Sequence, residues 1–195
     1  MVAGYHLIWT LYGFWLPNDI RGSTSKMIRV DRIKTLGEIH FGRKKVQPSS
    51  QQIREFFDEA RDVLWHPVLT LDDDDIVLLG KVFGEVIADC GYTCYACAIM
   101  PDHVHMLIRR HRDKAEQMIE NFQVRGRAAL IDAGKRKPTH PLWTGGEGWK
   151  TFLNTRRDFE REIEYIRQNP LKIGRSEQHW NFIKPYDGWL PAYRD

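Results

Sequence analysis

Two kinds of periodicity run along this chain and predict its elements. In some stretches apolar and polar residues alternate, which indicates strands, and in others apolar residues recur every three to four positions, which indicates amphipathic helices. The alternating runs predict strands at residues 5–11, 92–100, 103–110 and 149–153. The longer period predicts helices at residues 51–64, 72–90, 114–133 and 158–169. No run of ~18 apolar residues occurs, so no membrane span is expected.

The order of these elements predicts an α+β fold. Strand, helix, strand, strand, helix, strand is the order of the ferredoxin-like split βαβ fold, a four-stranded antiparallel sheet with helices on one face. The helix at 158–169 is an addition to it. We expect both strands of the hairpin, which turn at Pro101-Asp102, to be central in the sheet. We expect one domain over residues 1–175, with an irregular basic insertion at about 13–48, and an aromatic-rich tail at 176–195.

Candidate chemistry lies first in the second hairpin strand. His103 and His105 flank Val104 and so point to the same face of the strand, because strand side chains repeat every two residues. Two imidazoles on one face can hold a divalent metal ion. The alternative is a pair of ordinary core histidines, which is the better interpretation of this motif taken alone.

A second group of polar residues lies on the last predicted helix. Tyr165 and Asn169 are four residues apart and share a face of that helix. Asn169 offers a third metal ligand, although it also suits a helix C-cap before Pro170. A free tyrosine has a pKa of about 10, so it needs help to act as a nucleophile, and a divalent ion on a phosphate supplies that help. Mixed nitrogen and oxygen ligands suit Mn²⁺ or Mg²⁺. Together these residues suggest metal-assisted cleavage of a phosphodiester by tyrosine.

These two motifs, Met-Pro-Asp-His-Val-His-Met-Leu-Ile and Glu-Tyr-Ile-Arg-Gln-Asn-Pro-Leu-Lys-Ile-Gly, resemble those of the single-tyrosine HUH transposases. The branch they resemble most is the REP-associated tyrosine transposases. The resemblance implies cleavage of single-stranded DNA near hairpins through a 5′-phosphotyrosine, with Tyr165 as nucleophile and His103, His105 and Asn169 as metal ligands. Distant relatives have glutamine at the third ligand position, so Gln168 is a second candidate for it. The resemblance leaves open whether the protein is a monomer or a homodimer.

The charge is uneven along the chain, and the net charge is only +3. The segment that follows the His103–His105 strand is basic, and local positive charge is what phosphate binding needs. Candidate phosphate contacts are Arg109, Arg110, Arg112, Arg125, Arg127, Lys135, Arg136 and Lys137. Three tryptophans are candidates for stacking on unpaired bases, although core packing is the better interpretation of each: Trp143, Trp149 and Trp180.

Three cysteines, Cys90, Cys94 and Cys97, are interpreted as buried thiols in a reducing compartment rather than as a zinc site or disulfides. No signal-peptide pattern opens the sequence, and a cytoplasmic location is expected. Three alternatives to a transposase stay open: a domesticated DNA-binding protein on the same fold, an RNA-binding module, and a metal hydrolase of small phosphoesters.

Overall fold

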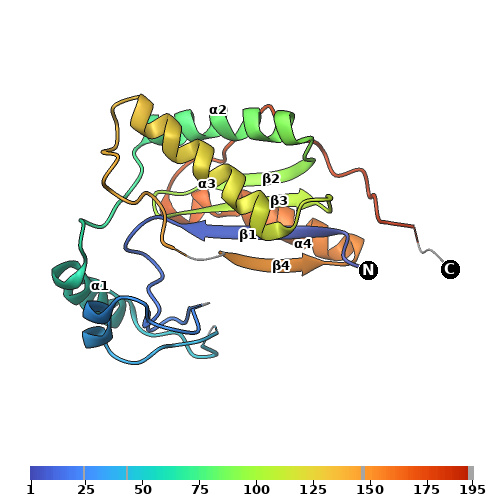
Figure 1. Cartoon of the computed structure of the whole chain (residues 1–195). Coiled ribbons are helices and arrows are strands. Elements are labelled where there is room, and N and C mark those ends of the chain that lie inside the picture. Colours follow the sequence, from blue (N-terminus) through green and yellow to red (C-terminus); the bar gives the residue numbers. More distant parts are fainter. Residues whose placement is uncertain (24, 43, 146–147, 193–195) are drawn as a thin grey trace. The chain divides into compact units, whose positions relative to one another are not determined.

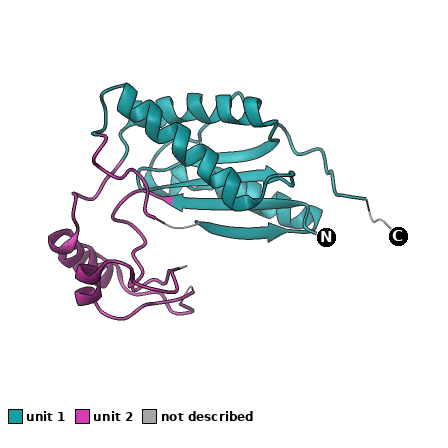
Figure 2. Cartoon of the chain, in the orientation of Figure 1, with its two compact units in different colours: residues 1–9, 71–137, 147–195 teal, residues 10–70, 138–146 magenta. Residues whose placement is uncertain are grey.

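The computed structural model describes residues 1–23, 25–42, 44–145 and 148–192. The chain divides into two compact units (Figure 2). Unit 1 contains residues 1–9, 71–137 and 147–195, and unit 2 contains residues 10–70 and 138–146. The irregular stretch expected at 13–48 therefore lies inside unit 2, and the last three residues of the tail lie outside the described part.

Unit 1 is built on a four-stranded antiparallel sheet with the strand order β2-β3-β1-β4 (Figure 1). This confirms the predicted α+β architecture. The strands are β1 (Gly4–Thr10), β2 (Cys94–Ile99), β3 (His103–Arg109) and β4 (Trp149–Leu153). The strand that carries both histidines, β3, is interior as expected. Its hairpin partner β2 is at the edge, so the expectation that both hairpin strands are central is wrong, because the crossover from β1 carries the chain past the position of β3 before β2 begins.

The helices of unit 1 cover both faces of this sheet. They are α2 (Asp73–Cys90), α3 (Ala115–Asp132) and α4 (Arg156–Gln168), and a 3₁₀ turn, η2 (Pro170–Ile173), follows α4. On one face Trp9 of β1 stacks on Phe122 of α3 and meets Phe83 of α2. On the other face Phe159 and Ile166 of α4 join a cluster with Leu107 of β3. No helix in the described ranges is long and apolar enough to cross a membrane.

Local signals in the sequence explain where these helices begin and end. Asp72 and Thr155 cap the N-termini of α2 and α4, each in a reciprocal capping box with the aspartate three residues on. Gly91 ends α2 in the left-handed conformation that glycine adopts without a steric cost. The predicted boundaries therefore agree with the structure to within about two residues.

The C-terminal tail closes the outer edge of β2. The side-chain amide of Gln178 makes two hydrogen bonds of 2.8 Å with Ile99, accepting from its backbone N–H and donating to its carbonyl. Further along, Ile183 bridges Cys94, and the Lys184 N–H donates to the Cys94 carbonyl. The tail thus satisfies backbone groups that an edge strand otherwise leaves unpaired.

Unit 2 has a small core of its own. It contains the 3₁₀ helix η1 (Asp31–Leu36) and the helix α1 (Ser50–Val63). Ile33 packs with Phe56 and Leu64 in the core. The carboxylate of Asp19 is buried and accepts two hydrogen bonds from the Arg21 guanidinium, at 3.0 and 2.7 Å.

Candidate active site

Three histidines meet on the α4 face of the sheet in unit 1. His103 and His105 of β3 point the same way, as predicted, and their Nε2 atoms lie 2.9 Å apart. His6 of the neighbouring strand β1 lies beside them, and its Nε2 is 2.9 Å from Nδ1 of His105. Both nitrogens of the His105 ring are therefore in contact with another imidazole.

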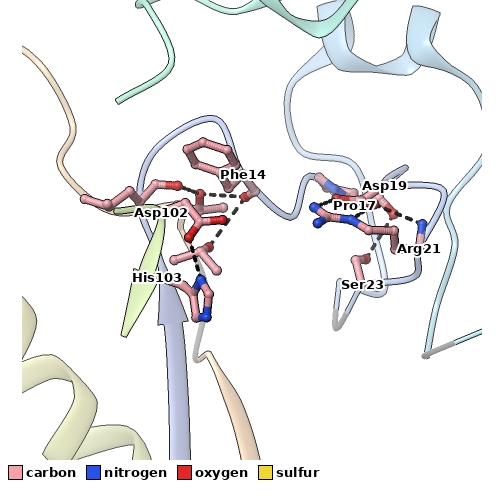
Figure 3. Close-up of polar contacts among 10 residues, drawn as sticks. Phe14, Pro17, Asp19, Arg21, Ser23, Asp102 and His103 are labelled. Carbon is pink, nitrogen blue, oxygen red and sulfur yellow. Dashed lines mark hydrogen bonds and ion pairs between the residues drawn. The ribbon is translucent and has the colours of Figure 1, made fainter. Parts of the chain in front are cut away.

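A carboxylate lies at each end of this row of rings. The Nδ1 of His103 is 2.6 Å from Oδ1 of Asp102, in the turn between β2 and β3 (Figure 3). The Nδ1 of His6 is 2.8 Å from Oε2 of Glu162 on α4. A continuous series of hydrogen-bonding contacts thus runs Asp102–His103–His105–His6–Glu162.

Tyr165 stands over the histidines from α4. Its ring centroid is 5.6 Å from that of His105, with the two rings perpendicular, and 5.9 Å from that of His6. The tyrosine is 42% exposed, so a ligand can reach it, whereas His105 beneath it is 3% exposed. The Nζ of Lys172, on η2, lies 4.1 Å from the centroid of the Tyr165 ring. The structure therefore places Tyr165 against His105 of the predicted pair, with the ammonium group of Lys172 beside the tyrosine ring.

The two candidates for a third ligand differ in their surroundings. Asn169 is buried, and its Nδ2 donates a hydrogen bond of 2.7 Å to the carbonyl of Tyr165. Gln168 is exposed and donates to Glu164 on the same helix, at 2.6 Å. The amide oxygen of Asn169 is the atom that a cation would use. Burial next to the tyrosine favours Asn169 over Gln168 for that role.

Burial and neighbouring charge govern ionisation in this site. Burial, with His103, His6 and Lys172 nearby, lowers the pKa of His105 well below its ordinary value. The hydrogen bond with His6 lowers the pKa of the Glu162 carboxyl, against the opposing effect of its partial burial. At neutral pH His105 is therefore neutral and Glu162 is ionised. A neutral imidazole can bind a metal ion, and an ionised carboxylate can accept the hydrogen bond from His6.

The number of hydrogens available to the contacts from Asp102 to Glu162 fits a cation between His103 and His105. Ionised carboxylates only accept hydrogen bonds, so the four contacts in the row need four hydrogens on three imidazole rings. Three neutral rings carry only three. A cation held between the two Nε2 atoms removes the need for the fourth hydrogen, because both of these atoms then present lone pairs. The residues present therefore fit a divalent ion at this position.

The side chains that most often bind metals do not by themselves complete the coordination of an ion at this position. In the described part of the chain, no group of three or more His, Cys, Asp or Glu side chains is arranged to hold one metal ion. An ion at the His103–His105 pair would therefore take oxygen ligands from elsewhere, such as the Asn169 amide, a phosphate or water.

The predicted phosphate contacts are spread over unit 1 in different states. Lys135 and Arg136 pair with the buried carboxylate of Asp75, so they hold the loop after α3 against the start of α2. Arg109 lies over the ring of Trp189, 3.3 Å from its centroid. Arg125 pairs with Glu85 and Asp89 on α2, and Arg112 is exposed beside Asp113. Arg110 and Lys137 are exposed, and Arg127 is half-buried. These arginines and lysines stay predictions as DNA contacts.

The predicted stacking tryptophans also differ. Trp180 fits into a notch in α2 opposite Gly80 and stacks on Phe182. Trp149 is 40% exposed on β4. Trp143 is half-buried in unit 2, where its backbone bridges that of Leu11. Core packing is thus the observed role of Trp180, whereas Trp149 retains an accessible ring.

Four residues of this site were not predicted from the sequence: Asp102, His6, Glu162 and Lys172. Asp102 directly precedes His103 in the predicted turn. The available signal for His6 is its place in the first strand, in a run whose other members apart from Thr10 are apolar or aromatic. Glu162 precedes Tyr165 by three residues and so shares its helix face. Lys172 belongs to a different element, η2, and nothing in its spacing from Tyr165 indicates the contact.

No protein-family model and no curated protein matches this sequence. Several solved structures resemble the chain, among them these two. A REP-associated tyrosine transposase bound to a REP hairpin is 13% identical, with a TM-score of 0.47 over 99% of this chain and 88% of that chain. A "putative transposase" from Deinococcus radiodurans is 12% identical, with a TM-score of 0.39 over 90% of this chain and 93% of that chain.

Proposed function

We propose that this protein is a metal-dependent single-stranded DNA endonuclease and strand transferase of the HUH tyrosine transposase type, acting at DNA hairpins. The observation that carries the proposal is the position of Tyr165 over His105, the ring that meets His103. An accessible hydroxyl-bearing side chain stands beside two imidazole nitrogens whose 2.9 Å separation suits a shared ion. An ion held by His103 and His105 would polarise a phosphate on the face of the sheet where Tyr165 lies.

In the proposed reaction, the Tyr165 oxygen attacks the phosphorus of a phosphodiester. The tyrosine–phosphorus bond forms as the hydroxyl of Tyr165 gives its proton to solvent and the bond from phosphorus to the 3′ oxygen breaks. That oxygen takes a proton from solvent and leaves as a 3′-OH. The product is a 5′-phosphotyrosine, which a DNA 3′-OH can later attack in the reverse sense. A divalent ion, Mg²⁺ or Mn²⁺, supplies charge withdrawal from the phosphate oxygens. The ammonium of Lys172 stabilises negative charge that develops beside the tyrosine ring.

Features of unit 1 argue against two alternatives, an RNA-binding module and a hydrolase of small phosphoesters. An RNA-binding sheet of this topology stacks bases on an open face with aromatic residues. Both faces of the sheet in unit 1 are covered by helices, and buried histidines lie under α4 instead. A hydrolase of small phosphoesters would use water and has no need of Tyr165. The remaining alternative is a protein that binds DNA without cleaving it. An assay for a covalent protein–DNA adduct distinguishes it from a transposase.

The test is a denaturing-gel assay with labelled single-stranded hairpin DNA from the flanks of the gene, with Mn²⁺ or Mg²⁺. Wild type should form a protein–DNA band that survives denaturation and disappears with chelator. Tyr165→Phe should form none, whereas Tyr5→Phe, the same change on β1, should form it normally. Tryptic digestion should place the nucleotide on the peptide 162–167, which contains Tyr165 alone among the tyrosines.

Each outcome of that assay has a definite meaning. An adduct of normal yield in Tyr165→Phe would remove Tyr165 as the nucleophile. Hairpin binding without an adduct under either metal would favour the DNA-binding protein. A preference for plain duplex, or for RNA over DNA in a parallel panel, would contradict the proposed substrate.

A further inference from the structure

His6 and Glu162 lie outside the metal-facing pair, yet they are joined to it by the same row of contacts. Glu162 meets His6 through Nδ1, and His6 meets His105 through Nε2. The side chains of His6 and Glu162 are 3% and 15% exposed, and His105 is buried with them. Few water molecules can replace a partner that is lost here, so the hydrogen bonds of each ring depend on its neighbours.

The position of the hydrogen on each ring follows from the carboxylate at the end of the row. An ionised Glu162 only accepts, so a His6 ring with a single hydrogen carries it on Nδ1, and its Nε2 carries a lone pair. That lone pair faces Nδ1 of His105, and this favours the His105 hydrogen on Nδ1. A hydrogen on Nε2 would instead leave two lone pairs facing each other between the two buried rings, whereas the His103 side chain is 20% exposed and can be solvated. The Nε2 of His105 is then left with a lone pair, and it is directed at Nε2 of His103.

Asp102 acts on the other ring in the same way. It accepts from Nδ1 of His103, which leaves a lone pair on the Nε2 of that ring. The two imidazoles thus present lone pairs toward one point, although they reach this state by different routes. His103 is oriented by a carboxylate directly, and His105 is oriented by a carboxylate through a second imidazole.

We propose that His6 and Glu162 are positioning residues, which hold His105 in the tautomer that directs its Nε2 lone pair at a divalent ion shared with His103. The proposal rests on the proposed metal-dependent function. It assigns to β1 and α4 a joint role in preparing the ligand on β3. Glu162 lies on the same helix as Tyr165, so one helix carries both the nucleophile and the group that orients the ligand beneath it.

The test reads the tautomers directly, in the metal-free protein, by ¹H–¹⁵N NMR of the imidazole nitrogens. Wild type should carry hydrogen on Nδ1 of both His6 and His105. Glu162→Met keeps the length of the side chain but removes the acceptor, so hydrogen should shift to Nε2 on both rings. Glu162→Gln keeps an acceptor oxygen and should restore the wild-type tautomer at least in part. Glu160→Met, the same change at an exposed position of α4, should leave both rings unchanged.

A second readout is the affinity for Mn²⁺, measured by calorimetry without DNA. Removing a group that orients a ligating histidine typically weakens metal binding 10–100-fold. Glu162→Met and His6→Phe should each show a loss of that size, and Glu160→Met should show none. His6→Phe keeps a planar ring and removes both nitrogens, so it tests the same row should Glu162→Met fail to fold.

The two readouts separate failure of this proposal from failure of the proposed function. If wild type binds Mn²⁺ through His105 but His6→Phe binds it equally well, the positioning role is overturned and the metal-dependent function stands. If His105→Ala binds Mn²⁺ as wild type does, the metal-dependent function fails. The tautomers of the metal-free protein still decide the positioning role in that case: unchanged tautomers in Glu162→Met would overturn it.

Discussion

The side-chain amide of Asn169 holds the backbone carbonyl of Tyr165 with a hydrogen bond of 2.7 Å. This contact joins the C-cap residue of α4 to the residue one turn earlier, so the last turn of the helix is fixed at the point where Tyr165 projects. The amide nitrogen of Asn169 donates the hydrogen bond that fixes the helix end, and its amide oxygen is the atom suited to bind a cation. The two roles of Asn169 can therefore be separated by substitution.

We predict that Asn169→Ala and Asn169→Asp both lower the free energy of unfolding but differ in metal binding. Both changes remove the donor to the Tyr165 carbonyl, which costs about 1–3 kcal/mol for a buried group. Asn169→Asp keeps an oxygen ligand and adds charge, so it should bind Mn²⁺ at least as well as wild type. Asn169→Ala should bind it more weakly. Urea unfolding and calorimetry measure the two effects, and equal Mn²⁺ affinity in all three proteins would remove Asn169 from the ligand set.

A second prediction concerns the contact between the tail and α2. A methyl group at Gly80 would overlap the ring of Trp180, whereas one at Gly84 would lie 3.2 Å from Phe182. Gly80→Ala should therefore displace Trp180 and lower the free energy of unfolding by about 1–3 kcal/mol, despite alanine's higher helix propensity. Gly84→Ala is the matched control and should be neutral or slightly stabilising. Tryptophan fluorescence should shift to the red in Gly80→Ala alone.

The three cysteines should differ in reactivity. Burial raises the pKa of the Cys94 thiol to about 12 and that of the Cys97 thiol well above its ordinary value, whereas Cys90 is half-buried. Because the thiolate is the reactive species, the native protein at pH 8 should expose one thiol to a disulfide reagent. In denaturant all three should react. Cys90→Ser should abolish the native reaction, and rapid reaction of two or more thiols in wild type would contradict the interpretation.

A pH-dependent contribution to stability is expected where α3 meets β4. The hydrogen bond from Lys150, at 2.6 Å, holds the pKa of the Glu116 carboxyl below its ordinary value of 4.5. A carboxyl whose pKa is lower in the folded state binds fewer protons when folded, so its contribution is present above pH 4.5 and is lost as the pH falls further. Glu116→Gln should therefore lose less thermal stability than wild type between pH 5 and about pH 3. Glu120→Gln, on an exposed part of the same helix, should lose as much as wild type does.

The sequence was sufficient for most of the architecture of unit 1, because its signals are local. The alternation in β3 placed His103 and His105 on one face, and Asp72 and Gly91 marked the ends of α2. These local signals do not determine the order of the strands in the sheet. Whether β2 lies inside the sheet or at its edge depends on where the crossover through α2 returns, and no residue of β2 encodes that position by itself.

The site was predicted in part for the same reason. His103 and His105 are two residues apart, and Tyr165 and Asn169 are four apart, so secondary structure alone unites each pair. His6 and Glu162 are 156 positions apart in sequence and meet only through the packing of α4 on the sheet. Nothing in a single sequence states which of the other seven histidines, out of eight in the chain, will share a hydrogen bond with His105.

The tail's hold on β2 limits how copies of this protein can join through their sheets. Strand addition at that edge must first displace Gln178 from Ile99, whereas β4, the last strand on the other side, carries the half-exposed rings of Trp149 and Phe152. A sheet with two free edges can recruit copies without end. With one edge closed, association through β4 terminates at a pair, because both outer edges of that pair are then β2 strands already covered by their own chains.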